Sequence, residues 1–497
     1  MAVLPPDTMP PIRALRQSAA ADACIPWPLV QGETLAFAAS LQRRLLEDED
    51  RLPSGDDRDP DVLSRLVPLA PPARGLPLDD VFARLEEVLR LTPSSSSRRF
   101  VNQLFGGREP VAVAAEALAL WRNPSMYTFK AAGAQVLVEN AVLAHMLKHA
   151  GFAAGEGLFV PGGSLANLAA LLLARDRAAP EAREHGIARG LAVYASSESH
   201  YSLRKNAGIA GLGRQALRTV PVDPDGRMDV SALERQIELD RQQGLRPAMI
   251  VATAGTTVRG AFDDIERVSR IARTSGAWLH VDGALGASLL LSPRHRHLLR
   301  GVELADSLAW NPHKMMGIPL QSAALLLARR GGLARSFDER AEYLFQADDD
   351  DFNPGHRSLQ CGRRADAFKL WAAWLHLGDE GWAARVERQM LLAARAAELI
   401  AADAELELCE PPMSVNVCFR ATGCAAEELC ERLDRAGRLK IGFGDFRGER
   451  AIRFVCVNPA LTENDLRLIL AEVRSVAREI RGATAGRFEM ANAVHAT

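Results

Sequence analysis

Lys314 is the residue whose surroundings first indicate chemistry. It lies in SLAWNPHKMMGIPLQS (307–322), directly after a histidine and between a short apolar run and a Met-Met-Gly turn. Most lysines are exposed and carry no functional information. A lysine held among groups that lower its pKa can instead form a Schiff base with a carbonyl cofactor. We therefore treat Lys314 as a candidate cofactor-binding lysine, with an exposed loop lysine as the alternative.

Asp282 is the second candidate, at the end of an apolar run in AWLHVDGALGASLLL. A carboxylate at the end of a buried strand is costly unless a cation or a strong hydrogen-bond donor pairs with it. A protonated pyridine nitrogen would supply both, and the small residues Gly283 and Ala284 leave room for a flat ring. The alternative is an aspartate that caps the next turn.

A glycine turn in FVPGGSLANLAALLLAR could hold a phosphate. Gly162, Gly163 and Ser164 directly precede a clear helical pattern. Paired glycines let a ligand approach the backbone, and the N–H groups at the start of a helix attract anions. The alternative is a plain turn in which Ser164 caps the helix. The stretch lacks the GxGxxG spacing, so no dinucleotide site is predicted.

Three other predicted strands also end in polar residues. His200, in SSESHYSLRKN, could lay its ring on an aromatic cofactor, although a loop histidine with ordinary hydrogen bonds is the alternative. Thr253 begins the stretch TAGTTVRGAFDDI, and Asn311 and His313 directly precede the lysine. A lysine to form an imine, an acid to hold a ring nitrogen and a glycine turn to hold a phosphate together describe a pyridoxal 5'-phosphate site.

The elements that must position these residues alternate between strands and helices. The apolar runs GLAVYAS, AMIVATA, AWLHVDGA, DSLAWN and SAALLLAR are separated by helical patterns. Such strands are typical of a mostly parallel sheet covered by helices on both faces. Ligands bind at the carboxyl ends of such strands, where the candidate residues lie. We expect an α/β fold with a helical N-terminal segment (1–107), a large domain (108–383) and a small α+β C-terminal domain (384–497).

Composition argues against several classes of partner. The chain has 497 residues, of which 48% are hydrophobic and 25% charged, and its 60 Lys and Arg nearly balance its 62 Asp and Glu. This balance gives no reason to expect nucleic acid or an anionic membrane as a partner. No uncharged apolar stretch has the length of a signal peptide or a membrane span. The seven cysteines form no CxxC pair, so we expect no metal site and a reducing, cytoplasmic location.

The motifs as a set resemble those of the group II pyridoxal-phosphate-dependent amino acid decarboxylases, in the glutamate, cysteine-sulfinate and aspartate decarboxylase branch. The resemblance extends from about Arg98 to about Arg481, and NPHK, HVD and TAGTT together are its most specific part. It is also carried by RFVNQLFGG, NPSMYTF, PGGSLANL, SESHYSL, LQCGRRADAFKLW and IRFVCVNPA. The resemblance implies the fold-type I transferase fold, with a seven-stranded sheet in the large domain, and a homodimer with the active site at the interface. It also implies α-decarboxylation of an L-amino acid, acidic in this branch, to the amine and CO2.

The resemblance further implies a role for each matching residue. Lys314, Asp282 and His200 correspond to the catalytic set: the lysine that binds the cofactor, the partner of the ring nitrogen and the histidine stacked on the ring. The other cofactor-binding positions are Gly163, Ser164, Leu165, Thr253, Ala284, Asn311 and His313. The substrate-binding positions are Gln103, Leu104, Phe105, Phe352 and Arg453, of which the arginine holds the substrate α-carboxylate.

The loop ADDDDFNPGHRS (347–358) departs from the family pattern. Many relatives carry a tyrosine there that protonates the substrate carbon, and counting back from LQCGR places Phe352 at that position. Another donor, such as His200 or His356, would then complete formation of the amine. Alternatively, the reaction takes up oxygen and yields an aldehyde, as in relatives with the same replacement; cysteine-sulfinate-type members also lack the tyrosine, so Phe352 alone does not decide. A non-catalytic pyridoxal-phosphate-binding protein is the third hypothesis.

Overall fold

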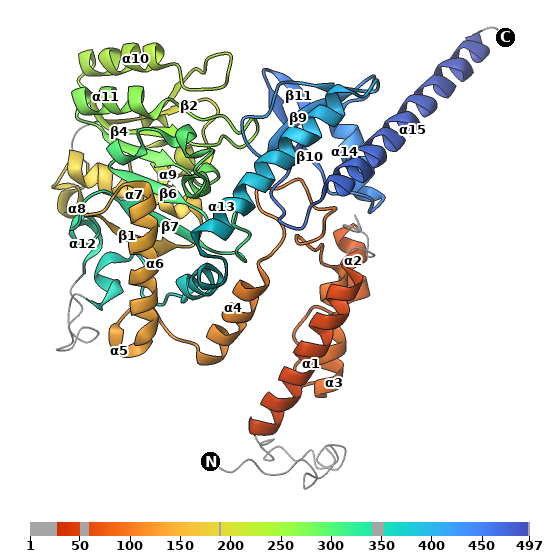
Figure 1. Cartoon of the computed structure of the whole chain (residues 1–497), viewed down its shortest axis with the longest axis horizontal. Helices are drawn as coiled ribbons and strands as arrows, with labels where there is room; N and C mark the ends of the chain where they lie inside the picture. The colour runs from red at the N-terminus through yellow and green to blue at the C-terminus, as the bar shows by residue number, and fades with distance from the viewer. Residues whose placement is uncertain (1–26, 50–58, 188–189, 340–351, 496–497) are drawn as a thin grey trace. The chain divides into compact units, whose positions relative to one another are not determined.

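The computed structural model describes residues 27–49, 59–187, 190–339 and 352–495 (Figure 1). The chain separates into two compact units, Met1–Ser94 and Ser95–Thr497. Within the described ranges, every helix is too short or too polar to span a bilayer. The domain boundaries expected at residues 107 and 383 stay predictions.

The first unit is helical. It contains α1 (Trp27–Asp48), α2 (Pro60–Leu66) and α3 (Leu78–Leu91). Asp59 caps α2 by accepting a hydrogen bond from the N–H of Asp61 at 2.8 Å, and proline takes the first helical position, where a missing N–H costs nothing. Phe37 of α1 stacks on Phe82 of α3 with ring centroids 4.1 Å apart. An aromatic contact thus holds the two longer helices together.

The second unit contains a seven-stranded sheet. Its strands are β1 (Glu156–Val160), β2 (Leu191–Ser196), β3 (Leu217–Val220), β4 (Arg246–Thr253), β5 (Trp278–Asp282), β6 (Ser307–Trp310) and β7 (Ala323–Leu327). They lie in the order β1-β7-β6-β5-β4-β2-β3. Every pairing among β2 to β6 is parallel, and β7 alone runs antiparallel to its neighbours, β1 and β6. The predicted mostly parallel sheet is confirmed.

Helices cover both faces of this sheet (Figure 1). The helices of this part of the chain are α4 (Pro110–Arg122), α5 (Phe129–Ala132), α6 (Ala134–Ala150), α7 (Gly163–Ala178), α8 (Ala182–His185), α9 (Ser202–Ile209), α10 (Val230–Gln242), α11 (Ile265–Ser275) and α12 (Gly332–Phe337). Those with the most extensive contacts to the strands are α6, α7, α9, α10 and α11. Short 3-10 turns are η3 (Arg214–Ala216), η4 (Gly286–Leu291), η5 (Arg296–Leu299), η6 (Val302–Leu304) and η8 (Pro354–Arg357). On β4, Ile250 belongs to the core cluster that contains α10 and α11, whereas Met249 and Val251 belong to the cluster that contains α7. Because both faces are buried, the strands are apolar throughout.

A four-stranded antiparallel sheet follows, in the order β10-β11-β9-β8. Its strands are β8 (Leu406–Leu408), β9 (Asn416–Ala421), β10 (Gly442–Phe446) and β11 (Glu449–Val455), accompanied by α13 (Asp366–Ala401), α14 (Ala426–Arg435) and α15 (Glu463–His495). Gly378 interrupts α13, because its φ of 62° and ψ of −178° are not helical. Before α15, Thr462 and Asp465 cap each other, each side chain accepting a hydrogen bond from the other's backbone N–H. Arg453, predicted to bind substrate, lies on β11.

Candidate active site

A cavity of about 280 Å³ lies at the carboxyl ends of the parallel strands. Residues predicted to bind the cofactor form most of its lining: Gly163, Ser164, His200, Thr253, Asp282, Ala284, Asn311, His313 and Lys314. The other lining residues are Pro161, Gly162, Asn167, Gly255, Thr257, Leu285 and Gln321. The fold therefore brings together segments that follow β1, β2, β4, β5 and β6.

Lys314 is held by a tight turn directly after β6. Its N–H donates to the Asn311 carbonyl at 3.0 Å, and the next side chains, Met315 and Met316, are fully buried and anchor the turn in the core. Burial lowers the pKa of Lys314, and the Asp282 carboxylate opposes that shift. A lowered pKa leaves more of the amine neutral, which is the form that attacks a carbonyl.

Asp282 ends β5 and is only 5% exposed. One carboxylate oxygen accepts from the Asn167 side-chain amide at 2.8 Å, and the other accepts from the N–H of Ala284 at 3.1 Å. The second bond is the turn cap that the sequence left as the alternative, and the carboxylate can still accept a further hydrogen bond from the cavity. The negative charge also offsets part of the lowering of the pKa of Lys314 and His200. Asp282 therefore stabilises its own turn and, at the same time, presents a negative charge to the cavity.

A chain of buried polar groups lies behind Asp282. Asn167 Oδ1 lies 3.0 Å from His280 Nε2, and His280 Nδ1 lies 2.8 Å from the Ser307 hydroxyl. The indole N–H of Trp278 donates to the same hydroxyl at 2.7 Å. Burial lowers the pKa of His280 to about 4, so its ring is neutral near pH 7. No motif in the sequence pointed directly to this chain.

The direction of each hydrogen bond in the chain follows from Asp282. A carboxylate only accepts, so the Asn167 amide nitrogen donates to it and the Asn167 carbonyl oxygen faces His280. The neutral His280 ring therefore carries its proton on Nε2, and its Nδ1 accepts from the Ser307 hydroxyl. Each group has one satisfied orientation, which holds the Asp282 carboxylate in one position.

The glycine turn forms the start of α7. Gly162, with φ of 94°, precedes the helix, and no side chain of the described residues caps it, so Ser164 is not the N-cap that the sequence left as the alternative. A Cβ at Gly163 would lie 2.7 Å from the Asn311 amide nitrogen, so any larger residue there would force the Asn311 side chain to move. The uncapped N–H groups at the start of a 16-residue helix can bind an anion.

Asn311 faces this glycine turn, and His313 lines the same cavity. The Asn311 Oδ1 atom is buried and has no hydrogen-bond partner among the described residues. His313 donates from Nδ1 to the Ser322 carbonyl at 2.5 Å, which fixes its ring, and burial lowers the pKa of His313 to about 4. The wall opposite α7 therefore offers a neutral imidazole and an amide oxygen that is free to interact with a ligand.

His200 completes the cavity at the end of β2. The N–H of Ser202 donates to His200 Nδ1 at 3.3 Å, so the neutral ring carries its proton on Nε2. Burial lowers the pKa of His200, which favours that neutral ring. The Ser202 hydroxyl lies 2.8 Å from the same nitrogen and accepts from the Asn167 amide at 3.3 Å. Asn167 thus connects the groups that hold Asp282 with those that hold His200.

Six predicted residues lie outside the cavity lining: Gln103, Leu104, Phe105, Leu165, Phe352 and Arg453. Leu104 is buried, and the ring of Phe105 lies 6.0 Å from that of Phe100. Phe352 packs against Phe129 with ring centroids 5.7 Å apart. The rest of the predicted loop before Phe352, residues 347–351, falls outside the described residues. The roles expected for these side chains stay predictions.

Arg453 lies beside the cavity without lining it. Its Nη1 donates to the carbonyl of Thr257, a lining residue, at 2.8 Å, and its Nη2 donates to the Asn102 carbonyl at 2.5 Å. Its Nε is buried and lacks a partner among the described residues. The positive charge of Arg453 also contributes to the lowered pKa of Lys314. A guanidinium whose Nε–H is unused among the described residues therefore lies near the predicted cofactor-binding lysine.

Comparison with known proteins agrees with this arrangement. Residues 60–422 match the family model described as the pyridoxal-dependent decarboxylase conserved domain. The chain belongs to this decarboxylase family. It is 37% identical to human cysteine sulfinic acid decarboxylase over 85% of this chain and 91% of that protein, and 35% identical to the mouse acidic amino acid decarboxylase GADL1 over 85% and 81%. The crystal structure of mouse CSAD is similar with a TM-score of 0.85 at 33% identity, covering 90% of this chain and 99% of that one.

The cofactor of this decarboxylase is pyridoxal phosphate, and the cavity residues fit it. Lys314 offers an amine for the aldehyde, and Asp282 offers a fixed acceptor for a protonated ring nitrogen. The uncapped start of α7 suits the phosphate, and Asn311 Oδ1, which has no partner among the described residues, marks a polar position that a ligand can fill. The predicted family, fold and cofactor are confirmed, whereas the role of each residue is a proposal.

Sequence reasoning missed Asn167, His280 and Ser307, although weak signals were present. Asn167 lies four residues after Gly163, so helical periodicity places both on one face of α7. His280 lies two residues before Asp282, so both point to the same face of β5. Ser307 pairs with His280 in the register of β5 and β6, which no local pattern reveals.

Proposed function

We propose that this decarboxylase removes the α-carboxylate of an acidic L-amino acid, such as aspartate, cysteine sulfinate or glutamate, and releases the amine. The observation that carries the proposal is Arg453, whose buried Nε–H is unpaired among the described residues and whose charge acts on Lys314. A substrate carboxylate is a strong partner for such a donor. The acidic side chain is supported by the names of the relatives, which refer to cysteine sulfinic acid and to acidic amino acids.

Each residue of the site has a distinct task in this reaction. When bound, pyridoxal phosphate supplies a carbonyl carbon for the amine and a ring that accepts the electrons of the broken bond to the carboxylate. Lys314, with its lowered pKa, would hold the cofactor through its amine. Asp282 would favour a protonated ring nitrogen, because a fixed carboxylate stabilises the charged form. Arg453 holds the substrate carboxylate in position for cleavage.

The proton that replaces CO2 on the substrate carbon needs a donor in the site. His200 lines the cavity and carries its proton on Nε2, away from the Ser202 contacts to its Nδ1. His356, the other candidate from the sequence, lies on η8 with its Nδ1 2.7 Å from Asp338 and outside the cavity lining. We therefore assign the donor role to His200.

A decarboxylating aldehyde synthase is the second candidate function, and Phe352 is the observation that favours it. A phenylalanine has no acidic proton, so the substrate carbon would remain open to oxygen if no other group protonated it. This reaction consumes oxygen and releases ammonia and peroxide along with CO2. The presence of His200 in the cavity favours the amine instead.

Purified enzyme incubated with the standard amino acids, cysteine sulfinate and 2,4-diaminobutyrate tests these functions together. We expect CO2 and amine in equal amounts from an acidic substrate, without oxygen uptake. Lys314→Ala should abolish activity and the visible absorbance of covalently bound cofactor, whereas Lys205→Ala, at a lysine outside the cavity lining, should retain both. Oxygen uptake with an aldehyde product would establish the second function. Bound cofactor with no turnover of any substrate would favour the third hypothesis, a non-catalytic protein.

A homodimer is also part of the proposal. It is supported by large apolar side chains that α4 exposes in the single chain: Leu118, Leu120 and Trp121, with exposed fractions of 63%, 57% and 50%. Light scattering should give twice the mass of the chain, and Trp121→Glu should shift the mass toward the monomer. The cytoplasmic location stays a prediction.

A further inference from the structure

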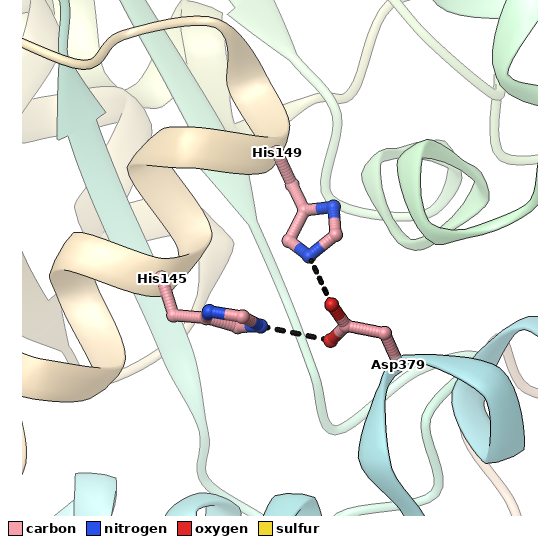
Figure 2. A group of neighbouring side chains, drawn as sticks. All are labelled: His145, His149 and Asp379. Carbon is pink, nitrogen blue, oxygen red and sulfur yellow. Dashed lines mark hydrogen bonds and ion pairs between the residues drawn. The ribbon is translucent and has the colours of Figure 1, made fainter.

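A second convergence of polar side chains lies on α6 and α13 (Figure 2). His145 and His149 are four residues apart on α6, so their imidazoles emerge one turn apart on the same face of the helix. Asp379 reaches them from α13. None of the three lines the cofactor cavity, and the proposed reaction uses none of them.

The donor atoms of this group point toward one another. His145 Nε2 lies 2.8 Å from Asp379 Oδ1, and His149 Nε2 lies 3.2 Å from Asp379 Oδ2 (Figure 2). A ligand atom from each of the three residues lies within 4.8 Å of the other two. Ligand atoms bound tetrahedrally to zinc are about 3.4 Å apart, because each lies about 2.0 to 2.1 Å from the metal. Small side-chain rotations would therefore bring all three within bonding distance of one ion.

Asp379 is placed by the interruption of α13. Gly378 leaves the helical conformation with φ of 62°, and Asp379 starts the second helical stretch. The indole N–H of Trp374, five residues earlier, donates to Asp379 Oδ1 at 2.7 Å. The edge of the same indole packs against His145 with ring centroids 4.9 Å apart. Carboxylates that bind metals are commonly oriented by such a hydrogen bond from behind.

We propose that His145, His149 and Asp379 bind a divalent transition-metal ion, with zinc the ion that the donors fit best. Two imidazole nitrogens and one carboxylate oxygen suit zinc, whereas magnesium and calcium prefer oxygen ligands alone. The side chains are 37%, 18% and 44% exposed, so an ion can reach them and water can take the fourth position. The ion replaces the two His–Asp hydrogen bonds.

The metal would join α6, which packs on the large sheet, to α13 at the residue where that helix is interrupted. The expected effect is on stability, because the site lies outside the cofactor cavity. The proposal departs from the expectation of no metal site, which rested on the cysteine pattern and did not consider histidines spaced by one helical turn.

The test measures zinc bound to untagged holoenzyme after treatment with a chelator, addition of Zn²⁺ and dialysis. We expect one zinc ion per chain by elemental analysis and a rise in Tm of about 2 °C or more. Mg²⁺ should produce neither. His149→Ala and Asp379→Asn should lose both effects while keeping bound cofactor and decarboxylation, and His376→Ala, an exposed histidine of the same helix, should keep both.

A spectroscopic readout keeps the test independent of how the variants fold. Co²⁺ added to the wild-type enzyme should give the visible absorption of a tetrahedral or five-coordinate ion, and Zn²⁺ should displace it. Cys361→Ser should leave the band unchanged, since Cys361 is an exposed free thiol that could otherwise bind cobalt. Absence of bound zinc and of the cobalt band, or equal zinc retention by His149→Ala, Asp379→Asn and the His376→Ala control, would overturn the proposal and leave an ordinary ion-pair cluster.

Discussion

On the proposed cofactor side of the active site, Asp282 ends one strand and Lys314 follows the neighbouring strand of the same sheet. On the proposed substrate side, Arg453 comes from a separate four-stranded sheet and Phe352 from the segment before η8. The first set lines a single cavity, whereas neither member of the second set does. The position of the first set therefore depends on the pairing of neighbouring strands, whereas the position of the second set depends on how separate parts of the fold pack together.

The cofactor side is fixed by strand register. Thr253 pairs with Asp282, and Asp282 pairs with Ala309, which immediately precedes the end of β6. Once these strands pair, their carboxyl ends must meet, and the polar residues there must share one cavity. The position of Arg453 depends instead on how the small sheet packs and on two backbone carbonyls that hold its guanidinium. Changes on the cofactor side should therefore alter the chemical step, and changes on the substrate side should mainly alter binding.

Among substitutions that leave Lys314 in place, Asp282→Asn should have the largest effect. An amide cannot stabilise a protonated ring nitrogen as a carboxylate does, so we expect kcat to fall about 100- to 1000-fold. Cofactor should remain bound, because Lys314 and the start of α7 are unchanged. Steady-state kinetics and cofactor absorbance measure both quantities, with Asp225→Asn, at an exposed aspartate, as the control. Retention of kcat within a few-fold would show that Asp282 does not act on the ring.

Arg453→Gln should separate binding from chemistry. The loss of one charge-assisted hydrogen bond to a carboxylate should raise KM about 10- to 100-fold, with a smaller fall in kcat. Arg447→Gln, at an arginine with an exposed side chain in the turn between β10 and β11, is the control. A fall in kcat alone, at unchanged KM, would contradict a carboxylate-binding role and place Arg453 with the residues that affect the chemical step.

His280→Leu tests whether the groups behind Asp282 position it. Leucine leaves Asn167 Oδ1 without its donor, so the amide can rotate and release Asp282, and we expect kcat to fall about 10-fold or more. His280→Gln can still donate to Asn167 and should recover part of the activity. If both variants lose activity equally, or neither loses any, the chain of hydrogen bonds does not position the carboxylate.

The same histidine should contribute to the pH dependence of stability. The pKa of His280 is about 4 in the folded chain and 6.5 when unperturbed, so the unfolded state binds the proton more readily between these values. Its contribution is complete above about pH 6.5 and is lost as the pH falls toward 4, by at most about 1.4 kcal/mol per pH unit. His280→Gln should therefore flatten the decline of Tm over this range. His376→Gln, at an exposed histidine, is the matched control.

The contrast between the two sides also explains which features could be predicted from the sequence. Asp282 and Lys314 could be found because a polar residue at or just after the end of an apolar strand is a local pattern with a physical cost. Gly163 could be found because paired glycines before a helical pattern are a local signal for an anion site. The reversed direction of β7 could not be found, because an apolar strand buried on both faces has the same composition in either direction. Asn167 could not be predicted, because its contact with Asp282 depends on which face of α7 packs against the sheet. Arg453 was placed through the family resemblance, since no local pattern marks it.

Phe352→Tyr should have the smallest effect on activity. It tests whether the residue that departs from the family pattern takes part in the chemical step or only in binding. The ring is 36% exposed and packs against Phe129, so a hydroxyl can be added with little strain. If His200 supplies the proton, the rate of amine formation should change by about threefold or less, since a donor required for catalysis would change it by about 100-fold or more. Product analysis with oxygen uptake measures this, with Phe129→Tyr as the matched control. If instead the wild-type enzyme makes aldehyde and the Phe352→Tyr variant makes amine, position 352 and not His200 determines whether the substrate carbon is protonated. The proposed substrate side would then also control the chemical step.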